Sequence, residues 1–102
     1  MKEISVETLK ELMDSGAPIQ IIDVREPSEH AEFNIGGKLL PLGQVLSFQL
    51  DEIDDLKDQE LYVYCRSGKR SMQACMFLEQ AGFSQVNNVT GGILAWQEKF
   101  GK

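Results

Sequence analysis

The chain has 102 residues, 42% of them hydrophobic, and this length predicts one domain over residues 1–102 with a single core. Its net charge of −6 excludes the broad basic surface that nucleic-acid binding needs, so small anions are the expected partners. The sequence has neither an apolar run long enough to span a bilayer nor an N-terminal signal-peptide pattern, so we expect a soluble, cytoplasmic protein without membrane contact.

The first half of the chain alternates helical and strand patterns. Ser5 can cap a helix whose apolar residues recur at helical spacing. Residues 19–24 predict a buried strand, and a short helical turn is expected over 28–31. Two weaker elements follow, a brief strand at 38–40 and one helix of uncertain limits within 44–56.

The second half predicts stronger elements. Residues 61–64 and 86–89 predict two short strands, and a helix is expected over 71–80. A last helix follows Gly91-Gly92, and we expect its apolar residues to close the core: Ile93, Leu94, Trp96 and Phe100. This alternation predicts an α/β fold with a mostly parallel central sheet flanked by helices on both faces.

In parallel sheets, ligands bind beyond the carboxyl ends of the strands. Cys65 follows one predicted strand, residues 23–25 end another, and Gly91-Gly92 follow a third. We therefore expect these three distant stretches to converge on one pocket.

Cys65 is the candidate nucleophile. It stands between an apolar strand and a helix, and three cations follow within five residues: Arg66, Lys69 and Arg70. The N–H groups at a helix start and nearby cations both favour a thiolate. The alternative, a small buried residue that finishes a strand, does not explain the three cations in an acidic chain.

The second cysteine, Cys75, lies on the apolar stripe of the predicted helix, and we expect it to be packed in the core. The two cysteines have the spacing of neither a metal site nor a disulfide framework, so reduced thiols are expected.

Acidic residues concentrate in one stretch, which is either a solvated connector or a surface for a basic protein partner: Asp51, Glu52, Asp54, Asp55, Asp58 and Glu60.

Four segments in order resemble a single-domain rhodanese, and the likeness runs nearly end to end. They are Ile-Ile-Asp-Val-Arg-Glu at 21–26, Val-Tyr-Cys-Arg-Ser-Gly-Lys-Arg-Ser at 63–71, Leu-Glu-Gln-Ala-Gly-Phe at 78–83 and Val-Thr-Gly-Gly-Ile-Leu-Ala-Trp at 89–96. The resemblance implies a rhodanese-like domain with thiosulfate sulfurtransferase activity. Cys65 would take the outer sulfur of a small anionic donor, hold it as a persulfide, and pass it to cyanide, a thiol or an acceptor protein. Because the sulfur itself is carried covalently, no metal or organic cofactor is implied.

The resemblance also implies roles for the neighbours of Cys65. The N–H groups of residues 66–70, which include Gly68, would cradle the persulfide or the donor, and Arg70 would orient the donor through two hydrogen bonds. Ser67 and Ser71 can donate hydrogen bonds to the bound group.

Outside the loop, Asp23 and Arg25 resemble the family's Asp-Val-Arg signature, which predicts a structural ion pair. Gly91 and Gly92 are expected to let the backbone approach the loop closely.

One stretch departs from the family pattern. Rhodaneses often carry His-x-Pro-Gly-Ala where this chain has Asn-Ile-Gly-Gly-Lys at 34–38, which leaves one wall of the pocket undefined. The resemblance gives the single histidine, His30, no role, and a surface position is expected for it.

Three other functions remain open. A cysteine phosphatase or arsenate reductase would place arginine six positions after the nucleophile, whereas Arg70 comes five after Cys65 and leaves a smaller loop. A non-catalytic binding or regulatory domain would not need the cationic loop. A persulfide carrier between proteins would use it, and the acidic stretch at 51–60 would then set partner choice.

Overall fold

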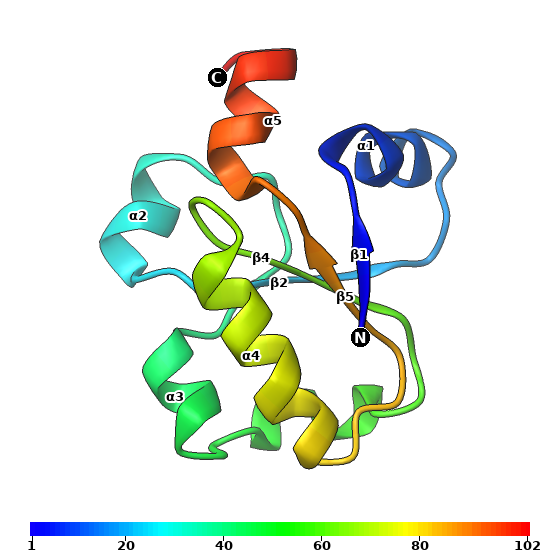
Figure 1. The fold of residues 1–102 in the computed structure, drawn as a ribbon, viewed down its shortest axis with the longest axis vertical. Coiled ribbons are helices and arrows are strands. Elements are labelled where there is room, and N and C mark those ends of the chain that lie inside the picture. The colour runs from blue at the N-terminus through cyan, green and yellow to red at the C-terminus, as the bar shows by residue number, and fades with distance from the viewer.

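Five parallel strands in the order β1-β5-β4-β2-β3 form the central sheet of the computed structural model, which describes residues 1–102 (Figure 1). All four strand pairings are parallel, so the predicted sheet is confirmed. The strands are β1 (Lys2–Ile4), β2 (Gln20–Asp23), β3 (Lys38–Leu39), β4 (Leu61–Tyr64) and β5 (Val86–Val89).

Helices cover both faces of this sheet (Figure 1). They are α1 (Val6–Asp14), α2 (Pro27–Glu32), α3 (Leu42–Leu46), α4 (Lys69–Gln80) and α5 (Gly92–Phe100), with a 3₁₀ helix, η1 (Asp51–Leu56). Helices α1 and α5 share a buried cluster with Tyr62 and Tyr64 on one face. Helices α3 and α4 pack on Ile22 and Val63 on the other face. Two cores therefore sandwich one sheet.

Every residue of β4 and of β5 is buried. Continuous burial is typical of a parallel strand with helices on both faces, and it explains the apolar and aromatic sequence of β4. In β5 the two middle residues, Asn87 and Asn88, are polar although they are buried. Both strands have the predicted bounds. The first helix also has its predicted cap, because the Ser5 side chain accepts a hydrogen bond from the Thr8 N–H at 3.1 Å.

Strand β1 was not predicted from the sequence. This strand has three residues, of which Lys2 and Glu3 are exposed, and it pairs with β5 alone at the edge of the sheet. A polar edge strand carries no apolar run by which it could be recognised.

The expected single helix within 44–56 is wrong. The chain forms the short helix α3 and then η1, and between them Phe48 has a φ of 56° in the left-handed region. A residue in this conformation ends the hydrogen-bonding pattern of a right-handed helix. Two other helices start earlier than predicted, α2 at Pro27 and α4 at Lys69. Proline suits the first helical position, because no helical partner is available there for an N–H.

The last helix closes the core only in part. Ile93 and Trp96 are buried as expected, whereas Leu94 and Phe100 are 42% and 40% exposed. The Phe100 ring packs edge-on against Trp96, with 4.8 Å between the ring centroids. The expectation that all four residues are core residues is therefore wrong for Leu94 and Phe100.

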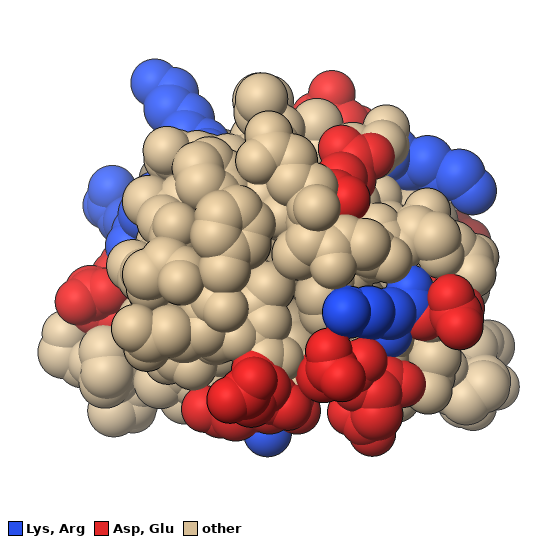
Figure 2. All heavy atoms as spheres, turned by 90° about the horizontal axis from the view of Figure 1, so that it is seen from below, with Lys and Arg blue, Asp and Glu red and all other residues tan.

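The acidic stretch lies at the lower end of the molecule in Figure 1, and its side chains are exposed except that of Glu60, which is half-buried. Seen from below, acidic side chains gather beside a wide area without charge (Figure 2). Asp54 pairs with Lys57 at 3.2 Å and Glu52 with Lys38 at 3.7 Å, so two of the acidic charges have cationic neighbours. None of the helices combines the length and apolarity needed to cross a membrane.

Candidate active site

The loop that follows β4 wraps around the sulfur of Cys65. Gly68 takes a φ of 99°, which turns the chain into α4 at Lys69. The Cys65 Sγ accepts hydrogen bonds from the N–H of Gly68 at 3.1 Å and of Ser71 at 3.3 Å, and the Ser71 Oγ lies 3.5 Å away. Cys65 itself is fully buried. The start of α4 thus directs its free N–H groups at a sulfur atom.

These hydrogen bonds decide the ionisation of Cys65. Burial alone would raise the pKa of the thiol, because it disfavours the anion. The hydrogen bonds that favour the anion outweigh burial and lower the pKa of Cys65 below its ordinary value when the Ser71 hydroxyl donates to the sulfur together with the N–H groups of Ser71, Gly68 and Ser67. The loop can therefore supply a thiolate.

Cys75 is the contrasting thiol. It is fully buried on the apolar side of α4, as expected, and burial raises its pKa to about 12. Both cysteines are free, and no three His, Cys, Asp or Glu side chains are grouped to hold a metal ion.

The start of α5 holds the carbonyl side of the loop. The Ile93 N–H donates to the Cys65 carbonyl at 2.9 Å, and the Leu94 N–H donates to the Arg66 carbonyl at 3.0 Å. Gly92 has a φ of 55°, and a Cβ built there would overlap the Cys65 carbonyl oxygen. A Cβ at Gly68 would lie 3.2 Å from the Gly91 nitrogen. Gly92 thus allows the close approach to the loop that was predicted for it, whereas a Cβ at Gly91 would meet the Ala95 side chain and not the loop.

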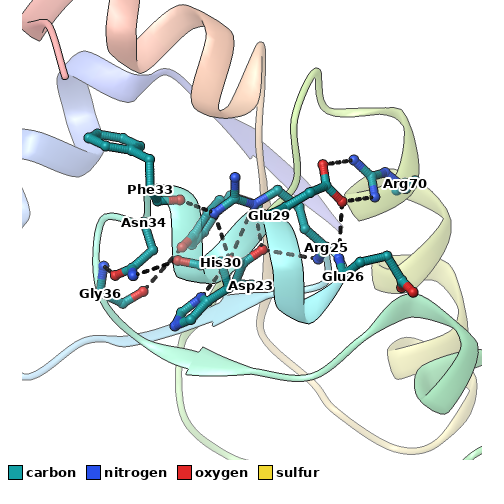
Figure 3. A network of polar contacts seen from close by, with 10 residues as sticks. Asp23, Arg25, Glu26, Glu29, His30, Phe33, Asn34, Gly36 and Arg70 are labelled. Atoms are coloured by element: carbon teal, nitrogen blue, oxygen red, sulfur yellow. Dashed lines mark hydrogen bonds and ion pairs between the residues drawn. The ribbon is translucent and has the colours of Figure 1, made fainter.

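Asp23 and Arg25 form a buried ion pair at the end of β2 (Figure 3). The Asp23 carboxylate accepts hydrogen bonds from the Arg25 N–H at 3.0 Å, from Nε at 3.0 Å and from Nη2 at 2.9 Å. The guanidinium also donates to the Phe33 carbonyl at 2.6 Å and lies over the Tyr64 ring. Burial opposes ionisation of Asp23, yet these hydrogen bonds lower its pKa. The pair is a structural unit that joins β2 to the segment after α2.

The expected surface position of His30 is wrong. Its Nδ1 lies 2.8 Å from Asp23 Oδ2 and its side chain is only 24% exposed, so it belongs to the Asp23 network (Figure 3). This contact could not be predicted from the sequence, because it depends on how α2 packs against the end of β2.

Arg70 is paired with Glu29, a residue that the sequence analysis missed. Nη1 donates to Oε1 at 2.8 Å and Nη2 donates to Oε2 at 2.9 Å (Figure 3). Glu29 Oε1 also accepts the Glu26 N–H, in a capping box at the start of α2. Both terminal nitrogens that we expected to orient a donor are therefore bound to a carboxylate. The capping-box spacing of Glu26 and Glu29 was the one available signal.

This ion pair predicts a pH-dependent stability. The Arg70 hydrogen bonds lower the pKa of Glu29 from 4.5 to about 2, so the carboxylate stabilises the fold fully above about pH 4.5 and loses this effect as the pH falls toward 2. Because the pair is partly exposed, we expect Glu29→Gln to lower the free energy of unfolding by about 1 kcal/mol at neutral pH.

Urea unfolding measured between neutral and acidic pH tests this. The difference between Glu29→Gln and wild type should shrink as the pH falls through the interval from 4.5 to about 2. Glu32→Gln is the matched control, because Glu32 is exposed on the same helix and has no ion-pair partner. A difference that stays constant with pH would contradict the assignment.

The segment at 34–38 builds a hydrogen-bonded turn of its own. The Asn34 side chain accepts from the Gly36 N–H and donates to the His30 carbonyl, both at 2.9 Å. Gly36 and Gly37 have φ values of 95° and 87°, and a Cβ at Gly37 would overlap the Ile21 carbonyl. The departure from the family pattern thus preserves the turn beside the Asp23 network.

A hollow of about 340 Å³ opens beside the loop. Arg66, Leu94 and Lys102 contribute to its lining, together with Phe33 and the two paired residues Arg25 and Glu29. Arg66 and Lys69 are the loop cations without a carboxylate partner.

A buried cysteine cradled by backbone N–H groups at the carboxyl edge of a parallel sheet defines a class of α/β proteins with a nucleophilic thiol. A comparison with known proteins assigns the chain to a family. Residues 5–99 match the model of the rhodanese-like domain, so the chain belongs to the rhodanese family.

Known relatives resemble the chain over most of its length. A sulfurtransferase of Allochromatium vinosum is 38% identical over 97 residues, which cover 94% of this chain and 88% of the relative. The crystal structure of a rhodanese-like domain protein from Staphylococcus aureus superposes with a TM-score of 0.82 at 33% identity, over 94% and 91% of the two chains. The human single-domain sulfurtransferase TSTD1 superposes with a TM-score of 0.80 at 25% identity, over 97% of each chain. These relatives support sulfur transfer as the general activity.

Proposed function

We propose that the chain transfers sulfane sulfur through a persulfide on Cys65. The observation that carries this proposal is the pair of N–H groups, from Gly68 and Ser71, that donate to the buried sulfur of Cys65. Such donors stabilise negative charge on the attacking thiolate and on the persulfide that replaces it.

The first half-reaction loads the cysteine. The Cys65 thiolate attacks the outer sulfur of thiosulfate, a sulfur–sulfur bond forms, and the sulfur–sulfur bond of the donor breaks. Sulfite leaves with the electron pair of that bond, and the protein keeps a persulfide with one negative charge. Arg66 and Lys69, which have no carboxylate partner, attract the anionic donor. Arg70 can orient the donor only by exchanging Glu29 for it.

The second half-reaction unloads it. A nucleophile such as cyanide or a thiolate attacks the outer sulfur, and Cys65 leaves as the thiolate. The hollow beside Arg66, at about 340 Å³, is far larger than cyanide, which favours a thiol or a segment of an acceptor protein as the natural acceptor. Because both cysteines are free thiols, we also propose a reducing compartment such as the cytoplasm.

The test is the mass of the intact protein after incubation with thiosulfate, followed by cyanide. We expect an adduct of one sulfur atom, and its release as thiocyanate in equal amount. A thiol in place of cyanide should also remove the adduct. A protein that gains no sulfur from thiosulfate would contradict the proposed donor, and an adduct that neither cyanide nor a thiol removes would contradict the transfer.

A further inference from the structure

A buried asparagine lies behind the loop, within reach of the groups that contact the sulfur. Asn88 is on β5, paired with β4, and is 1% exposed. Its Oδ1 lies 2.5 Å from the Ser71 Oγ, and its Nδ2 donates to the Gly68 carbonyl at 3.3 Å. No role for Asn88 was predicted from the sequence.

The Ser71 hydroxyl has three neighbours that can accept its single proton. They are the Asn88 Oδ1 at 2.5 Å, the Gly68 carbonyl at 3.2 Å and the Cys65 Sγ at 3.5 Å. Two oxygen atoms at 2.5 Å repel one another unless a proton lies between them. The Asn88 amide has no donor to offer there, because its Nδ2 is directed at the Gly68 carbonyl. The Ser71 proton therefore belongs to Asn88.

This assignment changes what Cys65 receives from Ser71. When the Ser71 hydroxyl donates to Asn88, the Ser71 oxygen presents a lone pair to the sulfur of Cys65. This lone pair can accept a hydrogen bond from the Cys65 thiol, but it repels the Cys65 thiolate, which can only accept hydrogen bonds. We propose that Asn88 is a positioning residue: by taking the Ser71 proton, it withholds a hydrogen bond from Cys65 and keeps the thiol more basic than the loop alone would make it.

A more basic Cys65 has opposite effects on the two half-reactions. A basic thiolate is the better nucleophile, whereas a less basic one is the better leaving group. Among molecules in which Cys65 is already ionised, Asn88 thus favours loading over unloading. This consequence rests on the proposed persulfide function, whereas the ionisation of Cys65 does not.

Removing Asn88 changes no charge near the sulfur. The charged and titratable groups around Cys65 are Arg66 on the loop, Lys69, Arg70 and Cys75 on α4, Glu29 on α2, Asp23 and Arg25 at the end of β2, and Tyr64 on β4. Strand β5 and the first turn of α5 carry no charged side chain. A shift caused by an Asn88 variant therefore reports on the Ser71 proton.

The experiment is a pH titration of the ultraviolet absorbance of the Cys65 thiolate, with the signal of Cys65→Ser subtracted. In Asn88→Ala the Ser71 hydroxyl is free to turn to the thiolate, which competes better than the Gly68 carbonyl because it is charged. We expect the ionisation constant of Cys65 to increase about tenfold. If Asn88→Ala does not fold, Asn88→Leu is the alternative variant, because leucine fills the space without a hydrogen-bond acceptor. The same increase of about tenfold in the ionisation constant of Cys65 is expected for it.

Two further variants make the result specific. Asn87→Ala removes the neighbouring buried asparagine, whose side chain bonds to Glu60 and the Leu61 carbonyl, and should leave the titration unchanged. In a Ser71→Ala background, Asn88→Ala should also have no effect. A wild-type titration in both Asn88 variants, or an equal shift with and without Ser71, would overturn the proposal; neither result depends on whether the protein transfers sulfur.

Discussion

Cys65→Ser is expected to reduce sulfur transfer by more than about a thousandfold, because the substitution removes the atom on which the sulfur is carried. The fold should survive. Serine has nearly the same shape, and the N–H groups of Gly68 and Ser71 that now bind Sγ can donate to its oxygen. The measurements are the initial rate of thiocyanate formation and the midpoint of thermal unfolding.

Cys75→Ala provides the matched control for this variant. Cys75 is buried in the core, with a pKa raised to about 12, so it is not expected to load sulfur. The control should keep most of the activity and one sulfur adduct per chain. Substantial transfer by Cys65→Ser, or loss of the adduct in Cys75→Ala with the fold intact, would assign the chemistry to a different group.

Gly92→Ala is expected to be the most destabilising substitution at the site. The new Cβ would overlap the Cys65 carbonyl oxygen and would lie 2.7 Å from the Arg66 carbonyl oxygen, and both atoms are backbone atoms that cannot rotate away. The residue also keeps a φ of 55°, which alanine adopts at a cost. We expect a loss of more than about 4 kcal/mol in the free energy of unfolding, measured by urea denaturation.

Gly16→Ala separates the two causes. Gly16 has a φ of 74°, and a Cβ there meets no atom within 4 Å. This variant is destabilised only by the left-handed backbone conformation, so its free energy of unfolding should fall by about 1–2 kcal/mol. Equal losses in the two variants would mean that the contact between α5 and the loop adds nothing to stability.

The sequence predicted those parts of the fold that are determined by nearby residues. The strand at 61–64 is buried on both faces, so its sequence is apolar and aromatic throughout, and Ser5 caps a helix three residues from its partner Thr8. The cationic loop after Cys65 was visible for the same reason, because its residues are consecutive in the chain.

What the sequence did not reveal depends on contacts between distant residues or on a single backbone angle. Glu29 reaches Arg70 across 41 positions, and Asn88 reaches Ser71 across 17. No pattern along the chain marks such pairs. The division of 44–56 depends on the φ of Phe48, a residue that rarely adopts a left-handed conformation, so its amino-acid type predicted the opposite.

The hydrogen bonds from α5 to the loop also bear on how this fold could change its chemistry. The N–H groups of Ile93 and Leu94 donate to two consecutive carbonyls, those of Cys65 and Arg66. N–H groups at the start of α4 donate to the sulfur of Cys65. Helix α5 therefore fixes the positions of the first two residues of the loop, Cys65 and Arg66. An inserted residue could be accommodated only between Arg66 and the start of α4. A wider loop for a bulkier anion would therefore have to bulge between these two points, away from α5.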